Sequence, residues 1–88
     1  PEAIICANDY VAAGIVSEAK RKGLKIPEDL AVIGFDNDLM SRILDITTIH
    51  NPIKQQAENA FKMIYEQLEK TTLEKVPLEF KLIIRKTT

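Results

Sequence analysis

The sequence predicts an α/β fold in which helices cover a mainly parallel sheet, a three-layer αβα arrangement. Residues 3–6 and 30–35 are short continuous apolar runs, which are typical of strands buried on both faces. Each run is followed by a polar loop and then by apolar residues at helical spacing. Strands and helices that alternate in this order form a parallel sheet, because each crossover returns the chain to the same end of the sheet.

The first helix is expected to follow residues 3–6 directly and to end near Lys22. Asn8 or Asp9 can supply its N-cap side chain, and Gly23 stands where a glycine commonly ends a helix. The residues that recur at helical spacing on its inward face are Ala12, Ile15, Val16 and Ala19.

The next expected elements are a strand over residues 30–35, a short helical turn over 39–44 and a brief β-type run over 47–49. Gly34 inside the second strand predicts that another part of the chain approaches its backbone closely. The polar residues 36–38 form the loop at the carboxyl end of that strand.

The longest helix is expected to begin with Pro52 at its first position and to end near Lys70. Its apolar stripe consists of Ile53, Ala57, Ala60, Phe61, Ile64, Tyr65 and Leu68. A loop over residues 71–77 then leads to an alternating strand, whose apolar face carries Leu78, Phe80, Leu82 and Ile84.

The composition argues against several classes of function. A net charge of −1 does not suit a nucleic-acid surface, which usually has a basic excess. No apolar run approaches the roughly 20 residues that cross a bilayer, and no signal peptide is present. Cys6 is the only cysteine, and its apolar neighbours indicate a buried, unreactive thiol. The first residue is not Met, so we expect a fragment of a longer protein.

Two polar loops are the candidate ligand site. Sheets of this kind bind ligands outside the carboxyl ends of their strands, and Asn8 and Asp36 follow the two predicted strands. We therefore expect both side chains to project into a shared hollow. A carboxylate accepts hydrogen bonds from sugar hydroxyls or a base N–H, and an amide both donates and accepts. The alternative is that Asn8 only caps its helix and Asp36 only satisfies turn amides.

Catalysis and metal binding have weaker support. Asp36 and Asp38 alone are too few ligands for a magnesium site, and the acidic pair and lysine of a phosphoryl-accepting aspartate are not evident. His50 has no Ser or Cys partner at a recognisable spacing, so a structural or pocket-rim role is favoured. With no phosphate loop, dinucleotide fingerprint or nucleophile elbow, we expect no catalytic residues, no metal and no cofactor.

A candidate interface lies on the outer side of the first helix. Ala13 and Ser17 are small residues on that face, which would let another element approach closely. Ile43 and Leu44 are apolar residues in a polar stretch, a pattern that often marks an interface. Both could instead cover the core of their own subunit.

Five segments together resemble the lactose/galactose-repressor family of transcription regulators. They are PEAIICAND at residues 1–9, GLKIPED at 23–29, LAVIGFDN at 30–37, ITTIHNP at 46–52 and LIIRKTT at 82–88. The segments occur in the family's order and extend over essentially the whole chain. The resemblance implies a fragment of a two-lobed periplasmic-binding-protein-like core. Residues 1–51 and about 80–88 would belong to the C-terminal lobe, and about 52–79 to the other lobe.

The resemblance also implies roles for single residues. Asn8 and Asp36 fall on effector-contacting positions, and Asn51 borders the cleft where the family usually has Gln. Ala13, Ile43 and Leu44 fall on positions of the dimer interface, to which the neighbouring Ser17 is added.

The function that follows from the resemblance is effector sensing. The expected ligand is a sugar or related metabolite, the expected assembly is a homodimer, and DNA would be bound only through a headpiece that this chain lacks. The expected location is cytoplasmic, with no membrane contact. The alternative is a periplasmic sugar-binding protein of the same fold.

Overall fold

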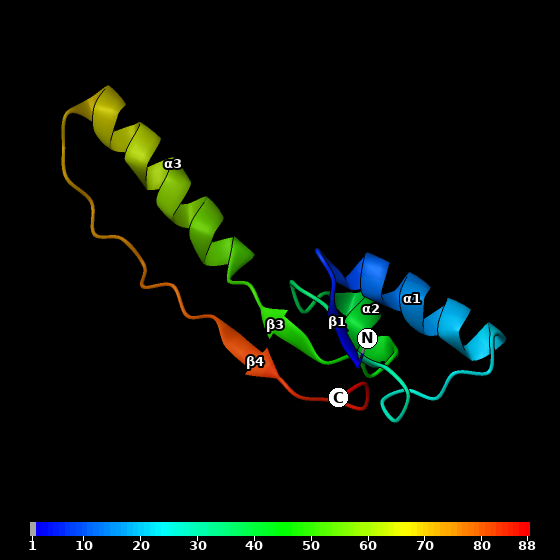
Figure 1. The fold of residues 1–88 in the computed structure, drawn as a ribbon. Coiled ribbons are helices and arrows are strands. Elements are labelled where there is room, and N and C mark those ends of the chain that lie inside the picture. The colour runs from blue at the N-terminus through cyan, green and yellow to red at the C-terminus, as the bar shows by residue number, and fades with distance from the viewer. Residues whose placement is uncertain (1) are drawn as a thin grey trace.

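A computed structural model describes residues 2–88 (Figure 1). Pro1, the first residue of the first family-like segment, lies outside the described residues. Every predicted element is present, although β1, β2 and β4 are shorter than predicted and β3 lies one residue later. In chain order the elements are β1 (Ala3–Ile5), α1 (Asp9–Arg21), β2 (Ala31–Ile33), α2 (Leu39–Ile43), β3 (Thr48–His50), α3 (Ile53–Glu69) and β4 (Lys81–Ile83).

The strands form a short parallel part and an antiparallel pair. β1 and β2 pair in parallel, with Ile4 opposite Val32. Single parallel bridges, one of them between Ile33 and Thr47, connect the β2 region to the β3 region. β4 pairs with β3 in antiparallel orientation, because the chain travels out along α3 and returns along residues 71–80. The α/β class is confirmed, and the antiparallel pair is a feature that the alternation of elements does not predict.

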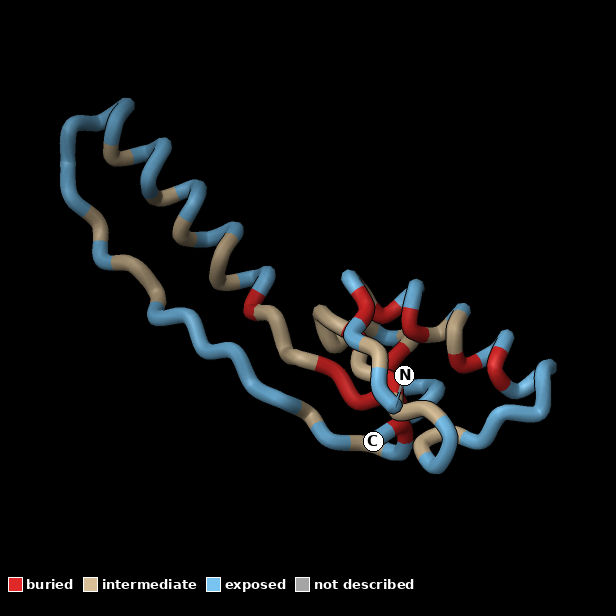
Figure 2. Tube along the Cα trace, in the orientation of Figure 1, coloured by how far each residue is buried: buried red, intermediate tan, exposed pale blue. Residues whose placement is uncertain are grey.

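The core lies between α1 and the parallel strands. Cys6, Ala12, Val16, Val32 and Ile46 form one buried cluster, to which α1 contributes the inward face that its periodicity predicts. Figure 2 shows the buried residues gathered in this part of the molecule. Apolar burial of this kind is the main favourable term in folding, so this part is the stable centre of the chain.

Local signals set the ends of the helices. The Oδ1 atom of Asn8 accepts a hydrogen bond from the Val11 N–H at 2.9 Å, so Asn8, one of the two predicted candidates, is the N-cap of α1. Gly23, just beyond the other end, has a φ of +80°, which glycine adopts at little cost. α3 begins at Ile53, one residue later than predicted, so Pro52 is the N-cap residue and not the first helical residue.

The molecule is elongated. Its radius of gyration is 17.4 Å, whereas a compact chain of this length would have about 12 Å. α3 and residues 71–80 extend away from the core, and no residue of α3 is buried (Figure 2). Phe61 is 66% exposed and Leu68 75% exposed. The helix therefore does not fold back on its own sheet, and its apolar stripe is unpartnered within residues 2–88. Over that range, no helix has the length and apolarity needed to cross a membrane.

Candidate effector-binding site

Asp36 lies just beyond β2 in an unusual backbone conformation. Its φ is +112° and that of Asn37 is +59°, values that side-chain-bearing residues rarely adopt. Two hydrogen bonds from these residues hold the loop against β3: the Asp36 N–H donates to the Ile49 carbonyl at 2.9 Å, and the Asn37 N–H donates to Thr48 Oγ1 at 3.2 Å. Conformations of this kind cost free energy, persist only where the surrounding structure determines them, and are common at functional sites.

Asp36 and Asn51, two of the predicted effector-binding residues, are in direct contact. Asn51 Nδ2 donates to Asp36 Oδ1 at 3.0 Å, and Gln56 Nε2 donates to Asn51 Oδ1 at 2.6 Å. These two hydrogen bonds connect Asp36, at the tip of β2, through Asn51 to Gln56 in the first turn of α3. Among the described residues, no donor forms a hydrogen bond with Asp36 Oδ2, so this half-buried carboxylate keeps one acceptor atom for a ligand.

Asn8 lies at the same edge of the sheet, and among the described residues no hydrogen bond joins its side chain to Asp36. It follows β1, which is the parallel neighbour of β2, so the predicted placement of the two loops is confirmed. Its Oδ1 caps α1, which leaves its amide nitrogen as the atom available to a ligand. The structure therefore joins Asp36 to Asn51 and leaves Asn8 separate, and the effector role of all three stays a prediction.

Asp9 is a buried residue whose importance the sequence did not reveal. It is 0% exposed, and both carboxylate oxygens accept hydrogen bonds: Oδ1 from the Thr48 hydroxyl at 2.6 Å and Oδ2 from the Asp38 N–H at 2.8 Å. A Cβ at Gly34 would overlap Asp9 Oδ1 and lie 3.3 Å from Asp9 Cα. The close approach predicted at Gly34 is therefore confirmed. The sequence offered Asp9 only as a possible N-cap and as the last residue of the first family-like segment, and neither signal indicated a buried carboxylate.

Arg85 is a second residue that sequence reasoning did not single out. Its Nη2 donates to Asn37 Oδ1 at 2.8 Å, and its Nη1 donates to the Ile46 carbonyl at 3.0 Å and to Ser41 Oγ at 3.2 Å. The C-terminal segment thereby holds the Asn37 side chain and the buried side of α2. Its position in the final family-like segment was the only available signal.

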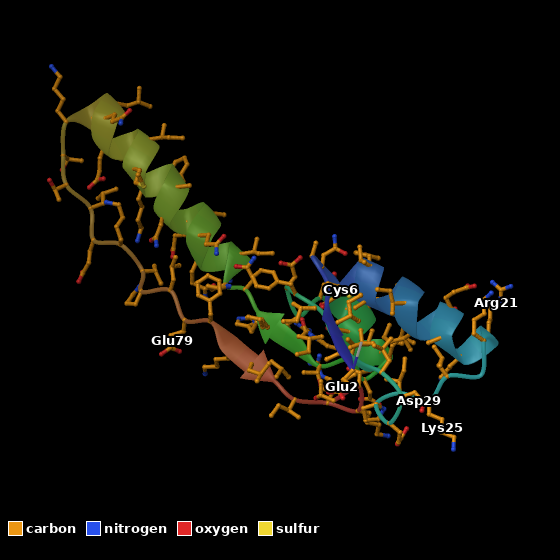
Figure 3. All side chains as sticks on the ribbon, viewed as in Figure 1. Glu2, Cys6, Arg21, Lys25, Asp29 and Glu79 are labelled. Atoms are coloured by element: carbon orange, nitrogen blue, oxygen red, sulfur yellow. The ribbon has the colours of Figure 1, made fainter. Side chains whose placement is uncertain are left out.

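A pocket of about 400 Å³ lies beside this site, between the end of β3, the start of α3 and the returning segment. Its lining consists of His50, Pro52, Gln55, Val76, Pro77, Glu79 and Lys81. His50 is a pocket-rim residue, as predicted, and its Nδ1 lies 3.3 Å from Asn37 Nδ2. None of the three predicted effector-binding residues lines this pocket. Figure 3 shows Glu79 on the returning segment, well away from Cys6 in the compact part.

Three of the four predicted interface residues are exposed on α1 and α2, whereas Ala13 packs partly against the core of this chain. Ile43 is 66% exposed and Leu44 is 44% exposed. The alternative that these two residues cover the core of their own subunit therefore does not hold. Ser17 is exposed and Ala13 is half-buried. Tyr10, Val11 and Leu39 add further exposed apolar surface on the same two helices.

Metal and thiol chemistry have little support at this site. Within residues 2–88 no three His, Cys, Asp or Glu side chains are grouped so that they could hold a metal ion. Cys6 is buried, and this burial raises the pKa of its thiol. A raised thiol pKa lowers the fraction of reactive thiolate at neutral pH.

Known proteins resemble this chain over its whole length. It matches the periplasmic binding protein-like domain family over residues 1–88. It is 44% identical over 93 residues to the NTD biosynthesis operon regulator NtdR of Bacillus subtilis, covering 100% of this chain and 28% of NtdR. It is 35% identical over 91 residues to the HTH-type transcriptional repressor PurR of Vibrio campbellii, covering 99% of this chain and 27% of PurR.

A solved structure gives the same result. A LacI-family transcriptional regulator from Lactobacillus casei with bound sucrose matches with a TM-score of 0.89 and 26% identity, over 100% of this chain and 34% of that regulator. The chain therefore belongs to the periplasmic binding protein-like domain family. Within that family it is a part of the effector-binding core of LacI-family regulators, as the sequence motifs predicted. It spans less than a third of the length of the curated relatives named above.

Proposed function

We propose that this chain is the effector-sensing and dimerisation part of a DNA-binding transcription regulator. In the whole protein it would bind a small polar molecule, such as a sugar or a related metabolite, in a cleft between two lobes. One observation carries the proposal: Asp36, held at the tip of β2, contacts Asn51 and keeps one free carboxylate oxygen. The regulators that resemble the chain, one of them with bound sucrose, support it.

The chemistry of the site suits a ligand with several hydroxyl or N–H groups. Asp36 Oδ2 can accept hydrogen bonds, and the Asn8 amide nitrogen can donate them, so a polyol could satisfy both. A preorganised carboxylate of this kind favours ligands with matching donors, since a ligand without them leaves a polar group unpaired.

Signalling would use the connection between the site and α3. Asn51 and Pro52 lie where the chain leaves β3 for α3, and Gln56 of α3 contacts Asn51. We place residues 1–51 and about 80–88 in one lobe and about 52–79 in the other. A ligand that contacts Asp36 and the other lobe together would favour the closed arrangement, and only such a difference in affinity shifts the population. A homodimer would transmit the change to paired DNA-binding headpieces, which fits a cytoplasmic protein.

A ligand screen on the full-length protein tests the proposal. We expect one compound from a panel of glucose, sucrose, cellobiose, xylose, adenine, guanine and glucose 6-phosphate to stabilise the folded state. At about 100 times its dissociation constant, such a ligand adds about 2.7 kcal/mol, which a thermal-shift measurement resolves. No stabilisation by any compound would count against a sensor of sugars or nucleobases.

Substitution of Asp36 assigns the site. We expect Asp36→Ala to remove the thermal shift, because the ligand loses its acceptor, and Asp36→Asn to reduce it. Asp45→Ala is the matched control, since Asp45 also has a positive φ, of 53°, but is an exposed residue outside the site. An unchanged shift in Asp36→Ala, with the fold intact, would remove Asp36 from the site.

A further inference from the structure

We propose that Asp9 is a positioning residue of the effector site. Its buried carboxylate holds the backbone of residues 36–38 and so fixes the conformation in which Asp36 is presented. The part of this inference that concerns the effector depends on the proposed function. The part that concerns the loop depends only on the contacts of Asp9.

Asp9 holds two consecutive amides that follow Asp36. The Asp38 N–H donates directly to Asp9 Oδ2 at 2.8 Å. The Asn37 N–H donates at 3.2 Å to the Thr48 hydroxyl, which in turn donates to Asp9 Oδ1 at 2.6 Å. Three elements therefore meet at one carboxylate: the start of α1, the loop after β2, and β3.

The carboxylate is suited to this position in a way that other side chains are not. Both of its contacts are donors, so the side chain must offer two acceptors, and an asparagine offers only one. Hydrogen bonds to an ionised acceptor are roughly twice as strong as neutral ones. Asp9 also lies in the first turn of α1, where the helix dipole favours a negative charge.

The loop needs such support because of its backbone. Asp36 and Asn37 have φ values of +112° and +59°, which persist only where surrounding contacts determine them. The same loop leads into α2. Its last residue, Asp38, is the N-cap of this helix, and Asp38 Oδ1 accepts a hydrogen bond from the Met40 N–H at 3.0 Å. Loss of the Asp9 contacts would therefore disturb both the placement of Asp36 and the start of the helix that carries Ile43.

Amide hydrogen exchange of the full-length protein tests the loop directly. In Asp9→Asn we expect the amides of Asn37 and Asp38 to exchange about tenfold faster, which corresponds to about 1.4 kcal/mol, the size of one lost hydrogen bond. Val16→Ala is the control, because it removes core packing on the buried face of α1 and changes none of the side chains that contact the loop. Unchanged exchange in Asp9→Asn would overturn the proposal. The proposal would also be overturned if these two amides exchanged equally fast in Val16→Ala and in Asp9→Asn, with the two variants having the same melting temperature.

A second pair of variants covers the case in which Asp9→Asn does not fold. Thr48→Val removes the hydroxyl that joins Asn37 to Asp9, whereas Thr48→Ser keeps it. We expect faster exchange at Asn37 in Thr48→Val and nearly normal exchange in Thr48→Ser. Similar exchange in both variants would show that the hydroxyl does not hold the loop.

Ligand binding separates this inference from the proposed function. With any panel compound that shifts the wild-type protein, we expect Asp9→Asn to weaken binding at least tenfold. In combination with Asp36→Asn, Asp9→Asn should add little, because it acts through Asp36. Full additivity would contradict a positioning role. If the wild type binds no panel compound, the proposed function fails, while the exchange data still decide whether Asp9 holds the loop.

Discussion

Gly34, just beyond β2, lies against Asp9 in the first turn of α1. The Asp9 carboxylate occupies the space in which any other residue at position 34 would place its Cβ. The Gly34 N–H also donates to the Thr47 carbonyl at 2.8 Å, so the backbone here cannot simply move away. A residue with no side chain thus makes room for a buried charge.

Gly34→Ala is expected to destabilise the protein. The added methyl group must displace Asp9 or the backbone, and overpacking of this kind costs about 1–3 kcal/mol. Urea unfolding of the full-length protein measures the effect. The matched control is Gly14→Ala in the middle of α1, where an added Cβ meets nothing within 4 Å. That change should stabilise by about 0.5–1 kcal/mol, because alanine is the better helix former. Equal effects of the two substitutions would contradict this account of Gly34.

At the scale of elements, polar contacts fasten the returning segment to α3. Asn59 both donates to the Val76 carbonyl and accepts from the Val76 N–H, each at 2.7 Å. Glu66 accepts from Lys75 Nζ and from the Leu73 N–H, each at 2.6 Å. These side chains replace the backbone partners that an extended segment would find in a sheet. The segment therefore follows α3 without being a strand until residue 81.

The Glu66 contacts predict a pH dependence. The hydrogen bond from Lys75, followed by that from the Leu73 N–H, lowers the pKa of the Glu66 carboxyl. Because the folded pKa is the lower one, the contribution of Glu66 is present above the usual pKa of glutamate and is lost as the pH falls through the lowered value. We expect the Leu73 amide resonance to titrate together with the Glu66 carboxyl. In Glu66→Gln this titration should disappear. A Leu73 resonance that is insensitive to acid would show that the contact is absent in solution.

At the scale of the whole molecule, two apolar surfaces have no partner within residues 2–88. One is the stripe of α3, which includes Phe61 and Leu68, and the other lies over α1 and α2 around Ile43. Surfaces of this kind are usually covered by another domain or subunit. Since the chain spans 28% of NtdR, the remaining length of a regulator of that size could cover the first surface. For the second surface we propose contact with a second copy of the chain.

Negative charges introduced into the predicted interface test the dimer prediction. Changing Ile43 and Leu44 together to Asp should convert a full-length dimer into monomers in sedimentation experiments, because two buried carboxylates would face their copies. Leu24→Asp is the control, since Leu24 is 46% exposed but lies beyond the end of α1, outside the predicted interface. A double variant that dimerises as strongly as the wild type would place the interface elsewhere.

The features that the sequence determined by itself depend on residues that are close together in the chain. The 3.6-residue spacing of Ala12, Val16 and Ala19, the Asn8 cap and Gly23 predicted α1 to within about one residue. The parallel pairing of β1 and β2 also followed, because a single crossover helix connects them. This pairing brought the Asn8 and Asp36 loops to one edge of the sheet, and the family motifs added Asn51.

Only the tertiary structure decided how distant residues meet. Three sets of contacts join positions at least 29 residues apart. They are the antiparallel pairing of β4 with β3, the two hydrogen bonds that Asp9 accepts, and the hydrogen bond from Arg85 to Asn37. No local pattern records such contacts, since their free energy depends on where packing places each side chain. Periodicity and capping act within a few residues and can therefore be read from the chain, whereas the satisfaction of a buried carboxylate is a property of the assembled fold.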